Sequence, residues 1–387
     1  MKALILSGGT GTRLRPLTYS NAKQLLPVAN KPILFYIIEK IVDAGIMDIG
    51  IIVGDTHAEI ESAVGNGSKW GVDVTYIHQP QALGLAHAVK TAAGFLKDED
   101  FMMILGDNLF LMELNELVKD FKLNPANALI LLHKSDNPSK YGVAVVEGER
   151  VIRLVEKPKI PPGNLIITGI YVFDHMIFAA IDKTIPSARG ELEITDAIQK
   201  LLDMGGNVAY KLTEGWWKDT GSLDDILEAN RLVLEKMESD NAAVRNSGCM
   251  GEQQTQSATS PGCMGEQQTQ SATGPGCMLE GLIRAGKNVY VTDSILKGPI
   301  VLGSNISING CRVGPYTAVG DHADFSGCEI EDSIILEGCT IKNVSQPITS
   351  SLIGKDSRVE GSGDERQKVR FFIGNDSKII HQGGKTG

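Results

Sequence analysis

A short repeat in the last third of the chain restricts the possible folds most strongly. Between Leu302 and Phe325, an apolar residue followed by a small or turn-forming residue recurs about every six positions. The pairs are Leu302-Gly303, Ile308-Asn309, Val313-Gly314, Val319-Gly320 and Phe325-Ser326, with a weaker continuation at Ile330, Leu336, Ile341, Ile353 and Ile373. This period predicts a parallel β-helix over residues 281–387, in which one apolar side chain per repeat points inward and each coil stacks on the last. An irregular β-sandwich is the alternative.

The first part of the chain, up to about residue 240, follows a different pattern, because strand-like and helix-like segments alternate along it. We expect an α/β domain over 1–240 with a mixed, mostly parallel sheet. The predicted strands are 3–6, 48–53, 72–78, 101–105, 128–133, 142–146 and 165–173, and the predicted helices are 32–44, 85–95 and 223–236.

Between these two parts lies a tandem duplication. Residues 248–261 read GCMGEQQTQSATSP and residues 262–275 read GCMGEQQTQSATGP, so the copies differ only at Ser260 and Gly274. The segment is polar and has no apolar periodicity, which predicts a linker over 241–280. Cys249, Cys263 and Cys277 lie 14 residues apart without a nearby His, and this spacing does not favour a metal site.

Composition excludes several classes of protein. The chain has 387 residues, enough for two or three domains, and a formal charge of 37 − 47 = −10. Such an acidic chain is not attracted to nucleic acid or anionic membranes in general, so we expect neither as a partner. The sequence has no apolar run of the ~20 residues that span a bilayer and no signal-peptide pattern. Six Cys without a CxxC pair are too few for a disulfide scaffold, and we expect a cytoplasmic protein.

A glycine-rich loop follows the first predicted strand, and it carries the strongest indication of function. Residues 6–14 read LSGGTGTRL, and Arg13 and Lys23 are the cations beside the glycines. The loop lacks the Gly-Lys-[Ser/Thr] ending of a Walker A motif, and Leu14 stands where a dinucleotide-binding fingerprint needs its third glycine. Glycines let backbone N–H groups approach an anion closely, so the loop and its two cations indicate a polyphosphate ligand.

These residues resemble a known family. The sequences GGTGTRL (8–14), KQLLPV (23–28), QP (79–80), GLAHA (84–88), GDN (106–108), YGV (141–143), EKP (156–158), TGIY (168–171), ARGELEITD (188–196) and WKDTG (217–221) are similar, in order, to those of sugar-nucleotide pyrophosphorylases. The resemblance covers residues 1–236 and is strongest to long-type glucose-1-phosphate thymidylyltransferases, which carry a C-terminal left-handed β-helix. It implies a Rossmann-like nucleotidyltransferase domain at the N-terminus.

The resemblance also implies the site residues. Arg13 and Lys23 would be catalytic, and Asp107 and Asp219 would hold Mg²⁺. The nucleotide would contact Leu6, Gly8, Gly9, Thr10, Gly11, Gln79, Pro80, Gly84 and Asp107. The sugar phosphate would contact Tyr141, Gly142, Glu156, Lys157, Thr168, Gly169, Tyr171 and Arg189.

The expected reaction suits these residue types. A sugar 1-phosphate oxygen attacks the α-phosphorus of a nucleoside triphosphate and expels pyrophosphate; this nucleophile is already ionised near neutral pH, so no general base is needed. Alignment and charge neutralisation are what remain for the protein to supply. Asp107 follows a predicted buried strand, at the sheet edge where open α/β folds bind ligands, and two carboxylates are common Mg²⁺ ligands.

Three readings of the function remain. The resemblance favours dTTP and glucose 1-phosphate as substrates, but UTP differs from dTTP by one methyl and one hydroxyl group. A non-catalytic nucleotide sensor would be marked by loss of Arg13, Lys23 or Asp107, and all three are present. A second, acyl-transferring activity of the β-helix would need a catalytic His, and His322 is the one His in the regular repeats. We expect residues 282–380 to mediate homo-oligomerisation.

Overall fold

The structure, a computed structural model, describes residues 1–9, 11–19, 21–124, 126–246, 272–362 and 368–382. Its contacts divide the chain into two compact units. The first contains Met1–Gly11, Asn21–Leu26 and Pro32–Asp219, and the second contains Thr12–Ser20, Pro27–Lys31 and Thr220–Gly387. This division differs from the predicted boundary at residue 240, because a long helix and two N-terminal segments pack in the same unit as the C-terminal strands.

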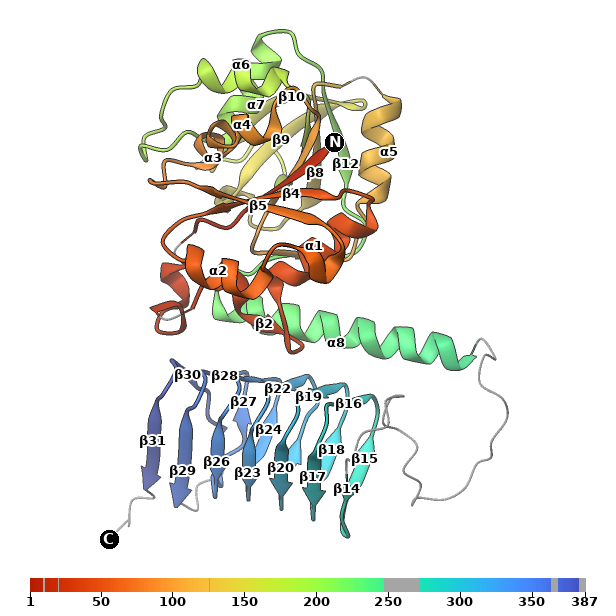
Figure 1. The fold of residues 1–387 in the computed structure, drawn as a ribbon, viewed down its shortest axis with the longest axis vertical. Coiled ribbons are helices and arrows are strands. Elements are labelled where there is room, and N and C mark those ends of the chain that lie inside the picture. The colour runs from red at the N-terminus through yellow and green to blue at the C-terminus, as the bar shows by residue number, and fades with distance from the viewer. Residues whose placement is uncertain (10, 20, 125, 247–271, 363–367, 383–387) are drawn as a thin grey trace. The chain divides into compact units, whose positions relative to one another are not determined.

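The first unit is built on a nine-stranded mixed sheet (Figure 1). The order is β5-β4-β1-β6-β11-β8-β12-β10-β9. The bounds are β1 (Lys2–Leu6), β4 (Asp48–Val53), β5 (Asp73–His78), β6 (Phe101–Leu105), β8 (Ala128–Lys134), β9 (Gly142–Glu147), β10 (Arg150–Glu156), β11 (Leu165–Phe173) and β12 (Val208–Leu212). Strands β5, β4, β1 and β6 pair in parallel, as does β12 with β8, whereas β11 and β10 pair antiparallel with their neighbours. The predicted excess of parallel pairing therefore holds for the N-terminal strands but not for the whole sheet, because β11 runs antiparallel to both β6 and β8, and β10 runs antiparallel to both β12 and β9.

Helices cover the sheet of the first unit. Helices α3, α4, α6 and α7 gather on one side and α1 and α2 on the other (Figure 1). The bounds are α1 (Ile33–Asp43), α2 (His57–Val64), α3 (Leu85–Thr91), α4 (Ala93–Leu96), α5 (Asn115–Leu123), α6 (Met176–Asp182) and α7 (Ile194–Asp203). The predicted helix over 85–95 is interrupted at Ala92. Every residue of β1 is buried, as expected for a central strand with helices on both faces.

The second unit contains three parallel sheets that form a β-helix (Figure 1). The first sheet has β14 (Ala272–Thr273), β17 (Val289–Thr292), β20 (Ile306–Asn309), β23 (Asp324–Ser326), β26 (Thr340–Lys342), β29 (Arg358–Ser362) and β31 (Lys378–Gln382). The second has β15 (Met278–Glu280), β18 (Ile295–Lys297), β21 (Arg312–Val313), β24 (Glu329–Glu331) and β27 (Ile348–Thr349), and the third has β16 (Ile283–Ala285), β19 (Ile300–Leu302), β22 (Thr317–Val319), β25 (Ile334–Ile335), β28 (Leu352–Ile353) and β30 (Phe372–Ile373). The β-helix prediction is confirmed.

The six-residue repeat of the sequence corresponds to the spacing between successive sides of a coil, and each coil has three sides. Each coil pairs with the next in parallel, for example Ser307 with Asp324, 17 residues on. Of the predicted inward residues, Leu302, Ile308, Val313, Val319, Phe325, Ile330, Leu336, Ile341 and Ile353 are buried, and Ile373 is half-buried. The corners use left-handed residues, such as Tyr316, Asp332 and Ser350 on successive coils. One apolar position per side of the coil therefore fills the interior.

Helix α8 (Leu223–Asn246) also belongs to the second unit. It extends ten residues beyond the predicted end at Lys236. At the other side of the predicted linker, β14 begins at Ala272, inside the second copy of the duplication. The rest of the duplication, including Cys249 and Cys263, lies outside the described residues, and the linker there stays a prediction. Of the helices that the structure describes, none is both long and apolar enough to cross a membrane.

Candidate active site

A cavity of about 260 Å³ lies at the carboxyl ends of β1 and β6 in the first unit. It is lined by Leu6, Gly8, Gly9, Lys23, Gln24, Ile52, Gln79, Ala82, Gly84, Leu85, Ala88, Leu105, Asp107 and Glu191. The glycine loop is packed closely here. A Cβ on Gly8 would lie 3.4 Å from Gln79 Oε1, and one on Gly9 would lie 3.3 Å from Lys23 Cε. The structure thus gathers the predicted catalytic Lys23 and six predicted nucleotide-site residues in one place: Leu6, Gly8, Gly9, Gln79, Gly84 and Asp107.

Lys23 and Asp107 form an ion pair in this cavity. Lys23 begins the short 3-10 helix η3 (Lys23–Leu25), and Asp107 follows β6, which pairs directly with β1. Both side chains are about 15% exposed, so the pair is only partly solvated. The site therefore presents a fixed cation and a carboxylate beside the glycine loop.

Asp219 reaches the same sheet edge through a small two-stranded ladder. Strand β13 (Trp217–Asp219) pairs antiparallel with β7 (Asn108–Phe110), which places Asp219 opposite Asn108, the residue after Asp107. Asp219 therefore ends a strand that is held against the segment carrying Asp107.

Buried polar atoms without a partner surround this region. Among the described residues, Ser7 Oγ, Gln24 Oε1 and Asn108 Oδ1 are buried and make no hydrogen bond. Ser7 follows β1, Gln24 lines the cavity, and Asn108 donates from Nδ2 to Asp107 Oδ1 at 3.0 Å. Sequence reasoning gave none of the three a role. Unsatisfied buried oxygens are uncommon, and a cluster of them next to two carboxylates suits a site that binds a cation and polar ligands.

Gln79 and Gly84 form another part of the cavity wall. Gln79 Nε2 lies 2.9 Å from His87 Nδ1 and 3.4 Å from the Gly84 carbonyl oxygen. Gly84 has a φ of +105°, and a Cβ there would overlap the Leu192 carbonyl oxygen. The backbone of Leu192 therefore requires this glycine, whether or not a ligand is bound. Pro80 is exposed and does not line the cavity, and Thr10 lies outside the described residues.

A second group of predicted residues converges on Glu156. Its Oε2 accepts a hydrogen bond from Thr195 Oγ1 at 2.7 Å, and its Oε1 lies 3.3 Å from both Lys157 Nζ and Arg189 Nη2. Gly142 is packed here too, because a Cβ on it would lie 2.7 Å from Thr195 Oγ1. A wider cavity of about 980 Å³ is lined by Glu156, Lys157, Arg189 and Asp196 among others. Sequence reasoning gave Thr195 no role.

The charges of this second group interact. Burial raises the pKa of Asp196, and the carboxylates of Glu193 and Glu156 raise it further. Burial opposes the charge of Arg189, but the hydrogen bond that Arg189 donates to Glu193 and the charges of Glu193, Glu191 and Glu156 together outweigh burial and raise the pKa of Arg189. Arg189 thus forms ion pairs with three acids of this group, Glu156, Glu191 and Glu193.

The structure does not bring the remaining sugar-site side chains to either cavity. Thr168 donates its hydroxyl hydrogen to the Leu131 carbonyl oxygen, and Tyr171 is buried in the core, stacked on Phe173. Gly169 has a φ of +81° and packs on Leu105. Tyr141 contacts the edge of Trp217, with ring centroids 5.7 Å apart. At β11 the predicted residues therefore build the sheet behind the site.

Arg13 lies in the second unit, on the 3-10 helix η1 (Thr12–Leu14). Its side chain is exposed, and a Cβ on Gly221 would lie 3.2 Å from the guanidinium. Gly11, two residues before Arg13, belongs to the first unit and has a φ of +60°. The predicted catalytic pair is thus divided between the two units, Lys23 in the first and Arg13 in the second.

Comparison with known proteins decides the family. The sequence model of the Nucleotidyl transferase family matches residues 2–236. The chain belongs to this family. As a nucleotidyl transferase it is also 43% identical to a glucose-1-phosphate thymidylyltransferase of Streptomyces antibioticus, over 98% of this chain and 99% of that one. It is 40% identical, with the same coverage, to a protein of the same name from Streptomyces griseus.

Two solved structures resemble the first part of this nucleotidyl transferase. A Bacillus anthracis chain assigned as a glucose-1-phosphate thymidylyltransferase, solved in complex with sucrose, is 39% identical. It matches with a TM-score of 0.57 over 60% of this chain and 94% of that chain. A UDP-glucose pyrophosphorylase in complex with UDP-glucose is 26% identical and has a TM-score of 0.55, over 61% and 98%. Both similarities support the Rossmann-like nucleotidyltransferase fold.

Proposed function

We propose that this nucleotidyl transferase converts dTTP and glucose 1-phosphate into dTDP-glucose and pyrophosphate. One observation carries the proposal. The glycine loop, Lys23, Asp107 and Gln79 share one cavity, in a chain that aligns end to end with relatives named for this activity. The phosphates of a nucleoside triphosphate require a cation and close backbone N–H groups. The side-chain amide of Gln79 is available to contact the base.

The reaction is a single in-line displacement. An oxygen of the sugar phosphate forms a bond to the α-phosphorus of dTTP, while the bond from that phosphorus to the bridging oxygen of the β-phosphate breaks. The electron pair leaves with pyrophosphate, and no proton needs to move. Backbone N–H groups of the Gly8–Gly9 loop and the Lys23 ammonium orient the triphosphate, and the Arg13 guanidinium stabilises the charge that develops on pyrophosphate.

Mg²⁺ is the cation that this site would take, and Asp107 and Asp219 would hold it. Their residues fit a hard cation, because both are carboxylates at one sheet edge and the unpartnered Asn108 Oδ1 is adjacent. The ion would supply charge neutralisation at the α-phosphate. Lys23 would then exchange its ion pair with Asp107 for a contact with phosphate oxygens.

The two cavities would divide the recognition of the substrates. Gln79, whose amide faces His87, would read the edge of the thymine base. Glu156 would accept hydrogen bonds from sugar hydroxyls, and Lys157 and Arg189 would hold the phosphate of the sugar. These roles predict a separation of effects, with base choice dependent on Gln79 and sugar choice on Glu156.

A pyrophosphate-release assay tests the function. Purified protein with Mg²⁺ is supplied with dTTP, UTP, ATP, CTP or GTP, each against several sugar 1-phosphates. The highest kcat/KM is expected for dTTP with glucose 1-phosphate. Release with none of the pairs would contradict nucleotidyl transfer, and a clear preference for another pair would contradict the substrates.

UTP is the second candidate for the nucleotide. A UTP–glucose-1-phosphate uridylyltransferase of Haloferax volcanii, AglF, is 39% identical over 240 residues, which is 98% of its length. A pocket discriminates one methyl group by only about 1–3 kcal/mol. The assay should therefore give a measurable rate with UTP.

An acyl-transferring β-helix receives less support. Relatives named bifunctional protein GlmU are similar over about 240 residues of this chain, but over only 55–56% of their own length. His322 is exposed at a left-handed corner of the β-helix. We also propose a cytoplasmic homo-oligomer. Among the described residues, Cys277, Cys311, Cys328 and Cys339 are free thiols, as is usual in a reducing compartment.

A further inference from the structure

A tight hairpin follows Lys23 in the chain and belongs to the second unit. Strands β2 (Pro27–Val28) and β3 (Lys31–Pro32) are joined by Ala29 and Asn30, with φ values of 47° and 61°. Two left-handed residues form the hairpin turn that suits the twist of β-strands, but alanine pays a steric penalty there. Such a conformation persists where its surroundings hold it.

Asn230 of α8 holds this hairpin. Its side chain is 1% exposed, and it uses both ends of its amide. Oδ1 accepts a hydrogen bond from the Ala29 N–H at 2.9 Å, and Nδ2 donates to the Tyr316 carbonyl oxygen of the β-helix at 3.1 Å. Asn30 adds a direct bond from its Nδ2 to the Val319 carbonyl oxygen at 2.6 Å. The turn is therefore tied to one coil of the β-helix both directly and through α8.

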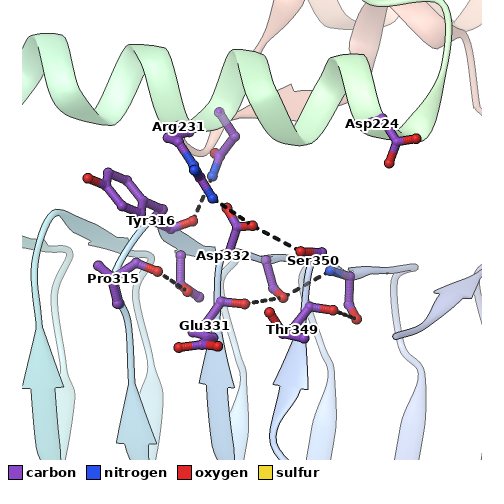
Figure 2. A network of polar contacts seen from close by, with 12 residues as sticks. Asp224, Arg231, Pro315, Tyr316, Glu331, Asp332, Thr349 and Ser350 are labelled. Atoms are coloured by element: carbon purple, nitrogen blue, oxygen red, sulfur yellow. Dashed lines mark hydrogen bonds and ion pairs between the residues drawn. The ribbon is translucent and has the colours of Figure 1, made fainter. Parts of the chain in front are cut away.

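Helix α8 is itself fixed on this corner of the β-helix. Figure 2 shows Arg231 of α8 directed toward Asp332, with Ser350 on the next coil also bonded to that carboxylate. Arg231 lies 2.9 Å from Asp332 Oδ2, and its guanidinium is 4.9 Å from the centroid of the Tyr316 ring. Arg370 pairs with Asp224 at the beginning of the helix. Asn230 is thus presented by an element that the coils themselves anchor.

The segment that carries Arg13 is held in the same unit. Leu14 and Leu17 are 1% and 0% exposed. A Cβ on Gly374, in the turn after β30, would lie 3.2 Å from Pro16 Cβ, so the last coils pack against this segment. Residues 12–20 and 27–31 therefore both belong to the unit of the β-helix, and Lys23 lies in the chain between them.

We infer that Asn230 and Asn30 are positioning residues for nucleotidyl transfer. Their hydrogen bonds hold the hairpin 27–31 on the β-helix. The hairpin in turn restrains the short stretch of backbone that connects it to Lys23. The inference rests on the proposed function, because it gives the β-helix a part in placing the cation that meets the phosphates. A displacement of about 1 Å in a catalytic group can cost up to about 100-fold in rate, so a lost anchor should appear in kcat.

Two matched substitutions test this. Asn30→Ala removes the bond to the Val319 carbonyl oxygen, and Asn288→Ala removes an amide hydrogen bond at another corner, from Asn288 Nδ2 to the side-chain Oδ1 of Asn305 at 2.9 Å. Asn288 also has a left-handed φ, 57°, so both changes carry the same backbone cost.

Asn30→Ala should lower kcat about tenfold and leave both KM values within about twofold. Asn288→Ala should leave kcat unchanged while lowering the melting temperature by a similar amount. Asn230→Ala, measured in parallel, should lower kcat at least as much as Asn30→Ala.

A second background separates positioning from general destabilisation. If Asn30 acts through Lys23, then Asn30→Ala added to Lys23→Ala should change kcat by less than about twofold. An undiminished tenfold loss in that background, or a wild-type kcat for Asn30→Ala alone, would overturn the inference. In both cases wild-type protein still releases pyrophosphate, so the proposed function survives. A wild-type protein that releases none would reject the proposed function itself.

Discussion

At the scale of single residues, the ion pair between Lys23 and Asp107 is the centre of the site. Each partner neutralises the other, which lets both charges stay at low exposure. Substrate binding would give each a new partner, phosphate for Lys23 and the metal for Asp107. The same two side chains therefore serve the stability of the free protein and the chemistry of the complex.

Replacing Lys23 with Ala should lower kcat/KM for dTTP by about 100- to 1000-fold, because one preorganised charge facing the transition state is lost. Lys23→Arg, which keeps the charge, should lose less. Pyrophosphate release under saturating glucose 1-phosphate measures both variants. A loss of less than about threefold in Lys23→Ala would remove Lys23 from the catalytic residues.

Asp196 gives a pH-dependent prediction. Burial and the nearby carboxylates of Glu193 and Glu156 raise its pKa, so the folded state binds more protons than the unfolded state between the ordinary and the raised value. Stability is therefore lost as the pH rises through that window. Asp196→Asn removes the charge and should raise the melting temperature at pH 7 by about 1–2 °C. The gain should shrink at a lower pH, inside that window, where the wild-type carboxyl group becomes protonated in the folded state. An equal gain at both pH values would contradict this account.

Residues of the site that are close to one another in the sequence could be predicted together. Residues that meet only in the folded chain could not. Gly8, Gly9 and Lys23 follow one strand closely, so their motif predicts that they meet. The unpartnered oxygens of Ser7, Gln24 and Asn108 could not be foreseen, because a missing hydrogen bond is a property of the folded chain. Tyr171 carries a family motif, yet strand alternation turns its ring into the core.

At the scale of elements, some short strands of the β-helix have a local sequence pattern that predicts them, and others do not. The β-helix could be predicted because its repeat is short, whereas β14 falls in a polar duplication without apolar periodicity. Its order comes from pairing: Ala272 and Thr273 align with Tyr290 and Val291, and the Gly274 N–H donates to the Val291 carbonyl oxygen at 2.7 Å. Tertiary hydrogen bonds thus decide its conformation where sequence propensity does not.

Gly274 is the position at which the two copies differ, and the first copy has Ser260 there. A Cβ on Gly274 would lie 2.7 Å from Thr292 Cγ2, so Gly274→Ser should destabilise the first coil of the β-helix by about 1–3 kcal/mol. Chemical unfolding of the full chain measures the change. Thr292→Ser removes the methyl group concerned, and the double variant should recover most of the loss. An unchanged free energy of unfolding in Gly274→Ser would contradict this prediction, because it would mean that the coil accommodates the added Cβ without cost.

At the scale of the whole molecule, the chain places its two cations in different compact units. The units could not be predicted from composition, because residues 12–20 and 27–31 are distant in sequence from the coils with which they pack. The similarity to AglF covers 240 residues, which are 61% of this chain and 98% of that shorter relative. We therefore expect a minimal form of this chain, without the β-helix, to carry out nucleotidyl transfer.

A chain that ends at Asn246 lacks the β-helix and should separate the contributions. It should retain measurable nucleotidyl transfer, with a kcat at least about tenfold lower because Asn30 and Asn230 lose their carbonyl partners. It should also elute as a smaller oligomer on size-exclusion chromatography with light scattering. The same oligomer as the full chain would contradict assembly through residues 282–380, and a folded but wholly inactive product would contradict the minimal form.

The most direct test of the central claim is the rate of pyrophosphate release from dTTP and glucose 1-phosphate with Mg²⁺, compared between wild-type protein and Asp107→Asn. Wild-type protein should release pyrophosphate and form dTDP-glucose in equal amounts. Asp107→Asn should need a higher Mg²⁺ concentration for half-maximal rate and should reach a lower maximum, because one of the two proposed ligands has lost its charge. Absence of dTDP-glucose with the wild-type protein, or an identical Mg²⁺ titration for the variant, would contradict the account.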